Sequence, residues 1–132
     1  MASLRLLVVD DNGEDVALLK HAFDVQGLAV DIVRASDGVE AVQLCGGEKG
    51  QSFHVILLDY HLPKMDGGQV AVRLKEMGVI PGVPVVLFTS HLPPAQQAQL
   101  KEAGSLTFVE KPNDFTGFCA IATRIADLGP SF

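Results

Sequence analysis

The chain has 132 residues, of which 48% are hydrophobic and 20% are charged. These proportions are those of a globular protein with one core, and they exclude a generally disordered chain. The formal net charge is -6 at pH 7 and no cluster of lysines and arginines stands out, which argues against direct binding to nucleic acid.

No stretch approaches the ~20 consecutive apolar residues of a membrane span, and the amino terminus lacks the basic and apolar regions of a signal peptide. Cys45 and Cys119 lie in separate predicted helices without metal-ligand spacing. We therefore expect buried thiols in a reducing compartment, and a cytoplasmic protein that does not contact membranes.

Apolar runs alternate with segments of helical periodicity along the chain. Residues 4–9 form the first apolar run, which ends at Asp10 and Asp11. Either Asp11 or Asn12 is suited to cap a helix over about residues 14–26. The later predicted strands are residues 29–33, 55–58, 84–89 and 106–109, and the later predicted helices are residues 39–45, 68–77, 93–103 and 113–128. The residues predicted to face the core from the first and third helices are Leu18, Leu19, Ala22, Phe23, Val70, Leu74 and Met77.

Strands that are apolar throughout and alternate with helices predict a parallel sheet covered on both faces. About five strand–helix units fit a flavodoxin-like doubly wound α/β fold, with a five-stranded sheet in the order 2-1-3-4-5. We expect residues 1–132 to form a single domain without an output domain. Ligands of such sheets bind beyond the carboxyl ends of the strands, where the strand order reverses, which here lies between the first and third strands.

The most informative residue at this edge is a carboxylate. Asp59 directly follows the aliphatic run 55–58, and burying an unpaired charge is costly, so Asp59 needs a cation or a chemical role. Asp10 and Asp11 follow the neighbouring first strand, and crowded carboxylates repel one another unless a cation intervenes. Ligands that are all oxygen suit Mg²⁺, which binds carboxylates together with phosphate groups.

Two further strand ends complete the pattern. Thr89 ends the fourth strand and supplies a hydroxyl donor, and Lys111 follows the fifth strand and supplies a mobile positive charge. An oxygen nucleophile, a metal ion and a cation that spreads charge are the parts of a phosphoryl-transfer site.

This joint pattern, together with the loop over residues 62–67, resembles the receiver domain of two-component response regulators over roughly residues 4–128. The resemblance implies a role for each matching position. These roles are phosphoacceptor for Asp59, Mg²⁺ ligation for Asp10, Asp11, Asp59 and the backbone carbonyl of His61, phosphoryl contacts for Thr89 and Lys111, and a switch role for Phe108.

The resemblance also implies a partner and an outcome. A sensor histidine kinase or a histidine phosphotransfer protein donates the phosphoryl group, and the new charge shifts the surface of the fourth helix, fifth strand and fifth helix. Such a chain is a signalling switch rather than an enzyme, although it assists its own phosphorylation and dephosphorylation. The chain length and the Thr89-Ser90 pair are most similar to stand-alone regulators of phytochrome-type kinases.

Several surface residues have two interpretations. His61 and His91 are either exposed loop residues or residues that control access of the hydrolytic water and so the lifetime of the acyl phosphate. The outward side of the first helix is either solvated or, as the resemblance implies, contacts the kinase through Asn12, Gly13, Val16, Ala17 and Lys20. The last helix is apolar around most of its circumference, which predicts a homodimer or output contact through Phe115, Phe118, Ile121 and Ile125.

Alternative functions remain open. One is a receiver domain cut from a longer regulator or hybrid kinase. Another is an aspartyl-phosphate phosphatase of the haloacid dehalogenase type, which carries an Asp-x-Asp pattern where this chain has Asp10-Asp11-Asn12. A flavodoxin is disfavoured because three carboxylates would repel the phosphate of its flavin.

Overall fold

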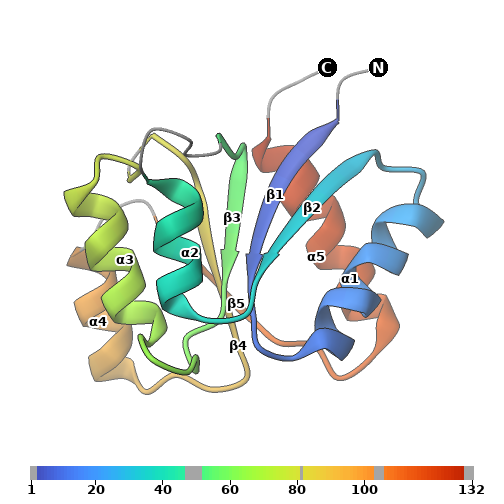
Figure 1. Cartoon of the computed structure of the whole chain (residues 1–132). Helices are drawn as coiled ribbons and strands as arrows, with labels where there is room; N and C mark the ends of the chain where they lie inside the picture. Colours follow the sequence, from blue (N-terminus) through green and yellow to red (C-terminus); the bar gives the residue numbers. More distant parts are fainter. Residues whose placement is uncertain (1–2, 47–51, 81, 103–105, 130–132) are drawn as a thin grey trace.

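The structure is a computed structural model that describes residues 3–46, 52–80, 82–102 and 106–129. Strands and helices alternate throughout these ranges, as the apolar periodicity predicts (Figure 1). The strands are β1 (Leu4–Val9), β2 (Val30–Ala35), β3 (Val55–Leu58), β4 (Val85–Thr89) and β5 (Leu106–Glu110). The helices are α1 (Gly13–Val25), α2 (Gly38–Cys45), α3 (Gly67–Glu76), α4 (Pro94–Glu102) and α5 (Phe115–Leu128).

The strands form one parallel five-stranded sheet in the order β2-β1-β3-β4-β5, which confirms the predicted fold. Helices α2, α3 and α4 cover one face of this sheet, and α1 and α5 cover the other (Figure 1). Because every strand runs the same way, the carboxyl ends of all five meet at one edge, which is the lower edge in Figure 1. The order reverses between β1 and β3, and a site is therefore expected beyond their ends.

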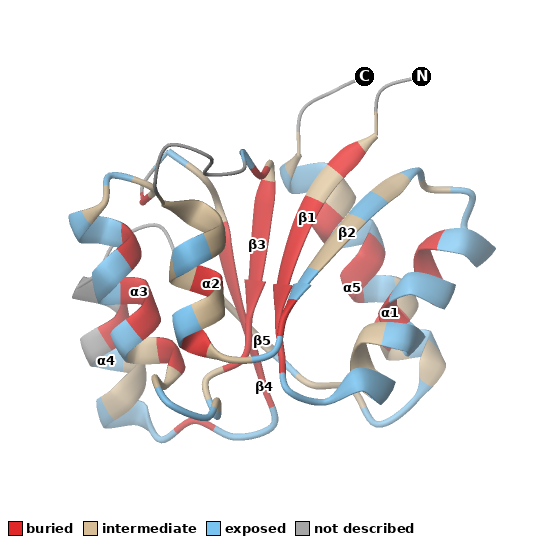
Figure 2. Ribbon diagram, in the orientation of Figure 1, coloured by how far each residue is buried: buried red, intermediate tan, exposed pale blue. Residues whose placement is uncertain are grey.

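The sheet separates two apolar clusters (Figure 2). Alternate side chains of one strand enter opposite clusters, as the period of two in a strand requires. In β1, for example, Leu7 and Val9 pack beneath α2 and α3, whereas Leu6 and Val8 pack beneath α1 and α5. All four residues of β3 are buried, and β3 pairs with β1 on one side and with β4 on the other, so Asp59 directly follows the central strand of the sheet.

Strand β2 differs from its predicted bounds of 29–33. It pairs with β1 over its whole length, from Leu4 opposite Val30 to Val9 opposite Ala35. Polar residues interrupt the apolar residues of β2. From the sequence alone, Arg34 therefore suggests the start of a loop rather than a continuation of the strand. Helix α5 also begins later than predicted, at Phe115, because the Asp114 side chain accepts a hydrogen bond from the backbone N–H of Gly117 and caps the helix.

The orientation of α1 corrects one predicted core residue. Leu18 was expected to face the core, but its side chain is exposed, whereas Val16 packs against the cluster that contains Leu19 and Phe23. Residues 16, 19 and 23 are spaced by three and four, which places them on one side of a helix, and Leu18 lies off that stripe. In α3, Met77 is the C-cap and is half-buried rather than part of the core.

The prediction that α5 presents an outward apolar contact surface is wrong for most of the residues assigned to it. Phe118, Ile121 and Ile125 are buried inside the chain itself, and they cannot form an outward contact. The reason is that α5 packs against α1 as well as against the sheet: Gln26 Nε2 donates to the carbonyl of Cys119 at 3.0 Å, and Thr123 Oγ1 donates to Gln26 Oε1 at 2.8 Å.

Phe115, the fourth member of that face, is half-buried and stacks on His21 of α1 with ring centroids 5.1 Å apart. The cysteines, predicted to be buried, are half-buried and unpaired among the described residues. Burial raises the pKa of the Cys45 thiol to about 11, so this thiol stays protonated at neutral pH. Among the residues that the structure describes, none of the helices is long and apolar enough to cross a bilayer.

Candidate functional site

The residues selected from the sequence converge at the carboxyl edge of the sheet. Backbone hydrogen bonds extend the strand ladders one residue past the strands and so fix the chain at these positions. Asp10 N–H donates to the carbonyl of Ala35 at 3.0 Å, and Asp59 N–H donates to the carbonyl of Val9 at 2.9 Å. Lys111 N–H donates in the same way to the carbonyl of Thr89 at 2.9 Å.

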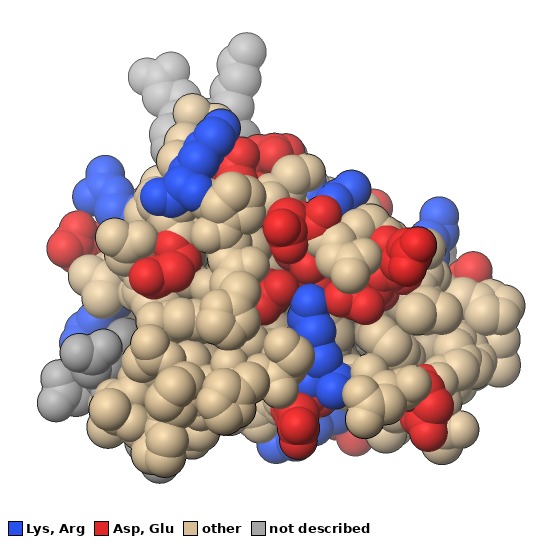
Figure 3. Space-filling view, turned by 90° about the horizontal axis from the view of Figure 1, so that it is seen from below, with Lys and Arg blue, Asp and Glu red and all other residues tan. Residues whose placement is uncertain are grey.

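Asp10, Asp11 and Asp59 form a compact group of carboxylates. One oxygen from each side chain lies within 4.8 Å of the others. Asp10 and Asp59 are 1% and 4% exposed, whereas Asp11 is open to solvent. Viewed from this edge, acidic side chains gather near the centre of the surface (Figure 3). Burial of several carboxylates is costly, and it is tolerated only where donors or cations compensate.

Each buried carboxylate has one oxygen satisfied by the backbone. Asp10 Oδ1 accepts from the N–H of Asn12 at 2.9 Å, and Asp59 Oδ1 accepts from the N–H of His61 at 3.2 Å. Burial raises the pKa of Asp10 above its ordinary value, and the Asn12 N–H and the Lys111 ammonium oppose that shift. In both residues the other oxygen, Oδ2, faces Lys111.

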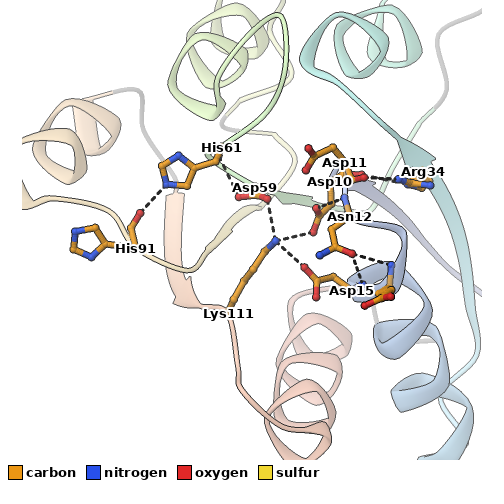
Figure 4. Close-up of polar contacts among 10 residues, drawn as sticks. Asp10, Asp11, Asn12, Asp15, Arg34, Asp59, His61, His91 and Lys111 are labelled. Carbon is orange, nitrogen blue, oxygen red and sulfur yellow. Dashed lines mark hydrogen bonds and ion pairs between the residues drawn. The ribbon is translucent and has the colours of Figure 1, made fainter.

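Lys111 reaches into the centre of this group (Figure 4). Its Nζ lies 3.0 Å from Asp59 Oδ2, 3.2 Å from Asp10 Oδ2 and 2.8 Å from Asp15 Oδ2. Burial alone would lower the pKa of Lys111, but hydrogen bonds to Asp15 and Asp59 outweigh burial and hold the pKa above its ordinary value. Lys111 is therefore a full positive charge at neutral pH, placed beside the proposed nucleophile.

The loop between β3 and α3 is shaped by close backbone contacts. Gly67 N–H donates to the carbonyl of Tyr60 at 2.7 Å, and a Cβ at position 67 would lie only 2.8 Å from the carbonyl oxygen of Asp59. Only glycine fits there. Asp66 then caps α3 in a capping box with Gln69, which explains why an Asp-Gly pair follows the acidic residue at this distance.

Two residues of the site were not selected from the sequence. Asp15 lies in the first turn of α1, one turn beyond Asp11, and a helix-capping acid is the ordinary interpretation of that position. Arg34, at the end of β2, donates through Nε to the carbonyl of Asp10 at 3.2 Å and through Nη2 to that of Asp11 at 3.0 Å. Its guanidinium therefore ties the backbone of the acidic pair to the adjacent strand (Figure 4).

The group of carboxylates fits a hard divalent cation. Asp10 Oδ2 is buried and accepts no hydrogen bond from the described residues, although it is ion-paired with Lys111. An oxygen in this state is available as a ligand. Several carboxylate oxygens close together, with Asp11 open to solvent, match the preference of Mg²⁺ for oxygen ligands. The predicted ligation by the backbone carbonyl of His61 stays a prediction.

Thr89 and Phe108 lie on the other side of Asp59. Thr89 is 6% exposed, and its Oγ1 finds no hydrogen-bond partner in the part of the chain that the structure describes. Both residues line a cavity of about 280 Å³, together with residues of the β4–α4 loop. Phe108 is half-buried at this cavity. A buried hydroxyl without a protein partner is unusual, and it is free to bond to water or to a ligand oxygen.

The two histidines are both exposed, and they differ in their contacts. His61 Nε2 makes a 3.0 Å hydrogen bond with the backbone carbonyl of His91, which joins the loop after β3 to the loop after β4 (Figure 4). The His91 side chain takes no part in this bond.

The predicted kinase-facing residues of α1 divide into two groups. Asn12 caps the helix, since its Oδ1 accepts from the N–H of Glu14 and that of Asp15. Gly13, Ala17 and Lys20 are exposed, as a contact surface requires. Val16 is half-buried in the core cluster and contributes less to the outer surface.

The fold and this edge together define a protein of the receiver class, and the comparison with protein families agrees. The chain belongs to the response regulator receiver domain family, whose model matches residues 6–123. Receiver domains of this family are signalling switches of two-component systems.

The chain is also similar to particular proteins and solved structures. It is 31% identical over 111 residues to hybrid signal transduction histidine kinase L of Dictyostelium discoideum. The aligned region covers 82% of this chain and 6% of that protein, so the chain spans only a small part of this relative. The bacteriophytochrome response regulator AtBRR is 30% identical, with a TM-score of 0.75 over 100% of this chain and 98% of that one. The Mn²⁺-bound form of response regulator Rcp1 shares the fold, with 22% identity and a TM-score of 0.79 over 92% and 91% of the two chains.

Proposed function

We propose that this chain is a phosphorylated switch in which Asp59 accepts a phosphoryl group from a sensor histidine kinase or a histidine phosphotransfer protein. The observation that carries the proposal is the position of Asp59: a carboxylate 4% exposed, with Oδ2 3.0 Å from the Lys111 ammonium and with the Asp10 and Asp11 carboxylates beside it. A carboxylate with a purely structural role would be destabilised by two further acids at this distance, because like charges repel.

In the proposed reaction, an oxygen of Asp59 forms a bond to phosphorus while the bond between phosphorus and the donor imidazole breaks. The departing imidazole then takes a proton from solvent. Mg²⁺, which Asp10, Asp11, Asp59 and the His61 carbonyl would hold, supplies charge neutralisation for the transferred group. Lys111 is already beside Asp59, with its Nζ 3.0 Å from Asp59 Oδ2, and it would donate to an oxygen of the transferred phosphoryl group.

The same proposal assigns the switch to Thr89 and Phe108. The Thr89 hydroxyl gains a partner when it donates to a phosphoryl oxygen, and the cavity of about 280 Å³ beside it gives Phe108 room to turn inward. The displacement would alter the outer surface of α4, β5 and α5, on which an output partner or a second copy of the chain would act. Sedimentation with and without a phosphate mimic tests the self-association.

The donor is expected to approach the outward side of α1, through Asn12, Gly13, Ala17 and Lys20. A phytochrome-type kinase is the donor class that the similarity to AtBRR favours. Cys45 and Cys119, unpaired among the described residues, support a cytoplasmic location, where thiols stay reduced. The phosphatase alternative loses support, because the residue two positions after Asp10 is Asn12, which caps α1.

Phosphotransfer tests the proposal directly. The chain is incubated with a phosphorylated kinase, or with acetyl phosphate and Mg²⁺, and labelling is measured by intact-protein mass spectrometry. We expect stoichiometric labelling of the wild-type chain, none of Asp59→Asn, and none after chelation of Mg²⁺. Asp114→Asn, a change of an exposed capping acid in α5, serves as the matched control and should be labelled normally. Persistent labelling of Asp59→Asn would refute the assignment.

A further inference from the structure

The shortest contact of Lys111 is not to the proposed phosphoacceptor. Its Nζ lies 2.8 Å from Asp15 Oδ2, closer than to Asp59 or Asp10. Asp15 comes from α1, whereas Asp10 and Asp59 follow strands (Figure 4). Among the described residues, the acids close enough together to share one ion are Asp10, Asp11 and Asp59, and Asp15 is not among them. Asp15 thus contacts the Lys111 ammonium but does not belong to the group of carboxylates that could bind a metal ion.

Lys111 and a divalent ion need the same carboxylates. The ammonium contacts Asp10 Oδ2 and Asp59 Oδ2, and these residues are two of the proposed Mg²⁺ ligands. A divalent ion bound there repels the ammonium, and it withdraws negative charge from the oxygens that hold it. With those carboxylates alone, each cation would weaken the binding of the other. Phosphoryl transfer as proposed above needs both cations at Asp59 together.

We propose that Asp15 is a positioning residue that retains Lys111 in the site when Mg²⁺ occupies Asp10, Asp11 and Asp59. This inference rests on the proposed function and adds to it a residue that acts through Lys111. Asp15 contacts the ammonium from α1 and lies outside the group of Asp10, Asp11 and Asp59, so that Lys111 and a bound Mg²⁺ would share the site instead of competing for the same carboxylates.

The local structure fits this role. Asp15 lies in the first turn of α1, where Asn12 Oδ1 accepts from the N–H of Glu14 at 3.0 Å and of Asp15 at 3.4 Å, so the backbone that carries the carboxylate is fixed. The side chains of Asp15 and Lys111 are 20% and 16% exposed, which shields their contact from water more than an ordinary surface pair. Glu14, the next acid, is exposed and is not an ion-pair partner of Lys111.

Mg²⁺ binding by the full chain tests the inference without reference to phosphorylation. Mg²⁺ is titrated by calorimetry into the wild-type chain and into Asp15→Asn, Asp15→Glu and Glu14→Gln. We expect Asp15→Asn to raise the Kd for Mg²⁺ about three- to tenfold, the range that couplings between close charges give. Glu14→Gln removes the same charge from the same helix turn, and it should change the Kd less than about twofold because its effect is screened. Asp15→Glu keeps a carboxylate and should restore most of the affinity.

A double-mutant cycle separates this role from general electrostatics. In a Lys111→Met background there is no ammonium to retain, so Asp15→Asn should affect Mg²⁺ affinity no more than Glu14→Gln does in the same background. Equal effects of Asp15→Asn and Glu14→Gln in the wild-type background would overturn the inference, as would an undiminished effect of Asp15→Asn without Lys111. Normal Mg²⁺ binding by the wild-type chain with either of these results leaves the proposed function intact. A wild-type chain that binds no Mg²⁺ overturns both.

Discussion

The polar groups on the two sides of Asp59 are held in different ways. The acidic side comprises Asp10, Asp11, Asp15 and Lys111. There Arg34 holds the backbone carbonyls of Asp10 and Asp11, and Lys111 is ion-paired with Asp10 and Asp15. The switch side comprises Thr89, Phe108, His61 and His91. There the Thr89 hydroxyl has no hydrogen-bond partner within the described ranges, a cavity of about 280 Å³ adjoins it, and an exposed side-chain bond joins the loops.

This difference matches what the proposed function requires of each side. Charge is stabilised most effectively by groups that are already in place, since reorganisation then costs little. A switch needs the opposite, namely a group whose partner is missing in one state and space into which a side chain moves. The chain therefore combines an ion-paired half and a half with an adjoining cavity around the same carboxylate, and we expect mutations on the two sides to have different consequences.

The largest effect is expected from the acidic side. Lys111→Met removes the cation beside Asp59, and we expect the rate of phosphorylation by acetyl phosphate at saturating Mg²⁺ to fall about 100-fold, as for loss of one donor in a preorganised site. Lys75→Met, in the exposed part of α3, is the control and should leave the rate unchanged. Rates within a factor of two for the two variants would contradict the role of Lys111.

The pH dependence of stability provides a second test of Lys111→Met. The pKa of Lys111 is raised on folding, so its stabilising contribution is fully present below the ordinary lysine pKa and is lost only as pH rises through the raised value. The wild-type chain should therefore be more stable than Lys111→Met at neutral pH. The difference should persist into mildly alkaline solution and shrink in strong base, as measured by urea denaturation without Mg²⁺.

Thr89→Val should have a smaller effect on rate and a different effect on stability. We expect phosphorylation to slow about tenfold, because Lys111 still donates to the phosphoryl group. Stability should stay the same or rise by up to about 1 kcal/mol, because a buried hydroxyl that lacks a partner is replaced by a methyl group of the same shape. Chemical shifts of α4 and β5 should no longer respond to phosphorylation. A clear loss of stability would mean that the hydroxyl is already bonded in the unphosphorylated chain.

Arg34→Gln tests the rigidity of the acidic side. It removes donors to the carbonyls of Asp10 and Asp11, and we expect the free energy of unfolding to fall by about 1 kcal/mol, given partial exposure to water. Mg²⁺ affinity should fall as well, because the acidic pair loses its tie to β2. Arg124→Gln, on the exposed side of α5, is the control for charge. An increase in Mg²⁺ affinity would show that repulsion by the guanidinium outweighs its positioning effect.

The smallest effect is expected at the loop contact. His61→Ala removes the bond to the His91 carbonyl, and we expect it to shorten the acyl-phosphate lifetime about two- to threefold by opening the site to water, with a change in stability below about 0.5 kcal/mol. His91→Ala keeps that bond, since only its backbone takes part, and provides the matched control. Equal lifetimes in both variants would show that the contact between the loops does not limit hydrolysis.

Much of the site follows from the sequence by one geometric rule. Asp10, Asp59 and Lys111 directly follow apolar strands, and Thr89 ends one. Parallel strands end at the same edge, so periodicity and strand order are sufficient to predict that these residues lie close together. The Asp-Gly pair at 66 and 67 was also readable, because its capping box and its close backbone approach are local.

The tertiary structure alone decided the rest. Whether Asp15 faces Lys111 depends on how α1 is rotated, and that rotation is set by Val16, Leu19 and Phe23 packing between the sheet and α5. The same packing exposes Leu18 and buries the apolar side of α5 that was expected to bind a partner. Arg34 reaches the acidic pair only because pairing with β1 extends β2 beyond its apolar run. Residues on strands are placed by the ladder of backbone bonds, whereas those on helices are placed by packing against distant parts of the chain, which the local sequence does not encode.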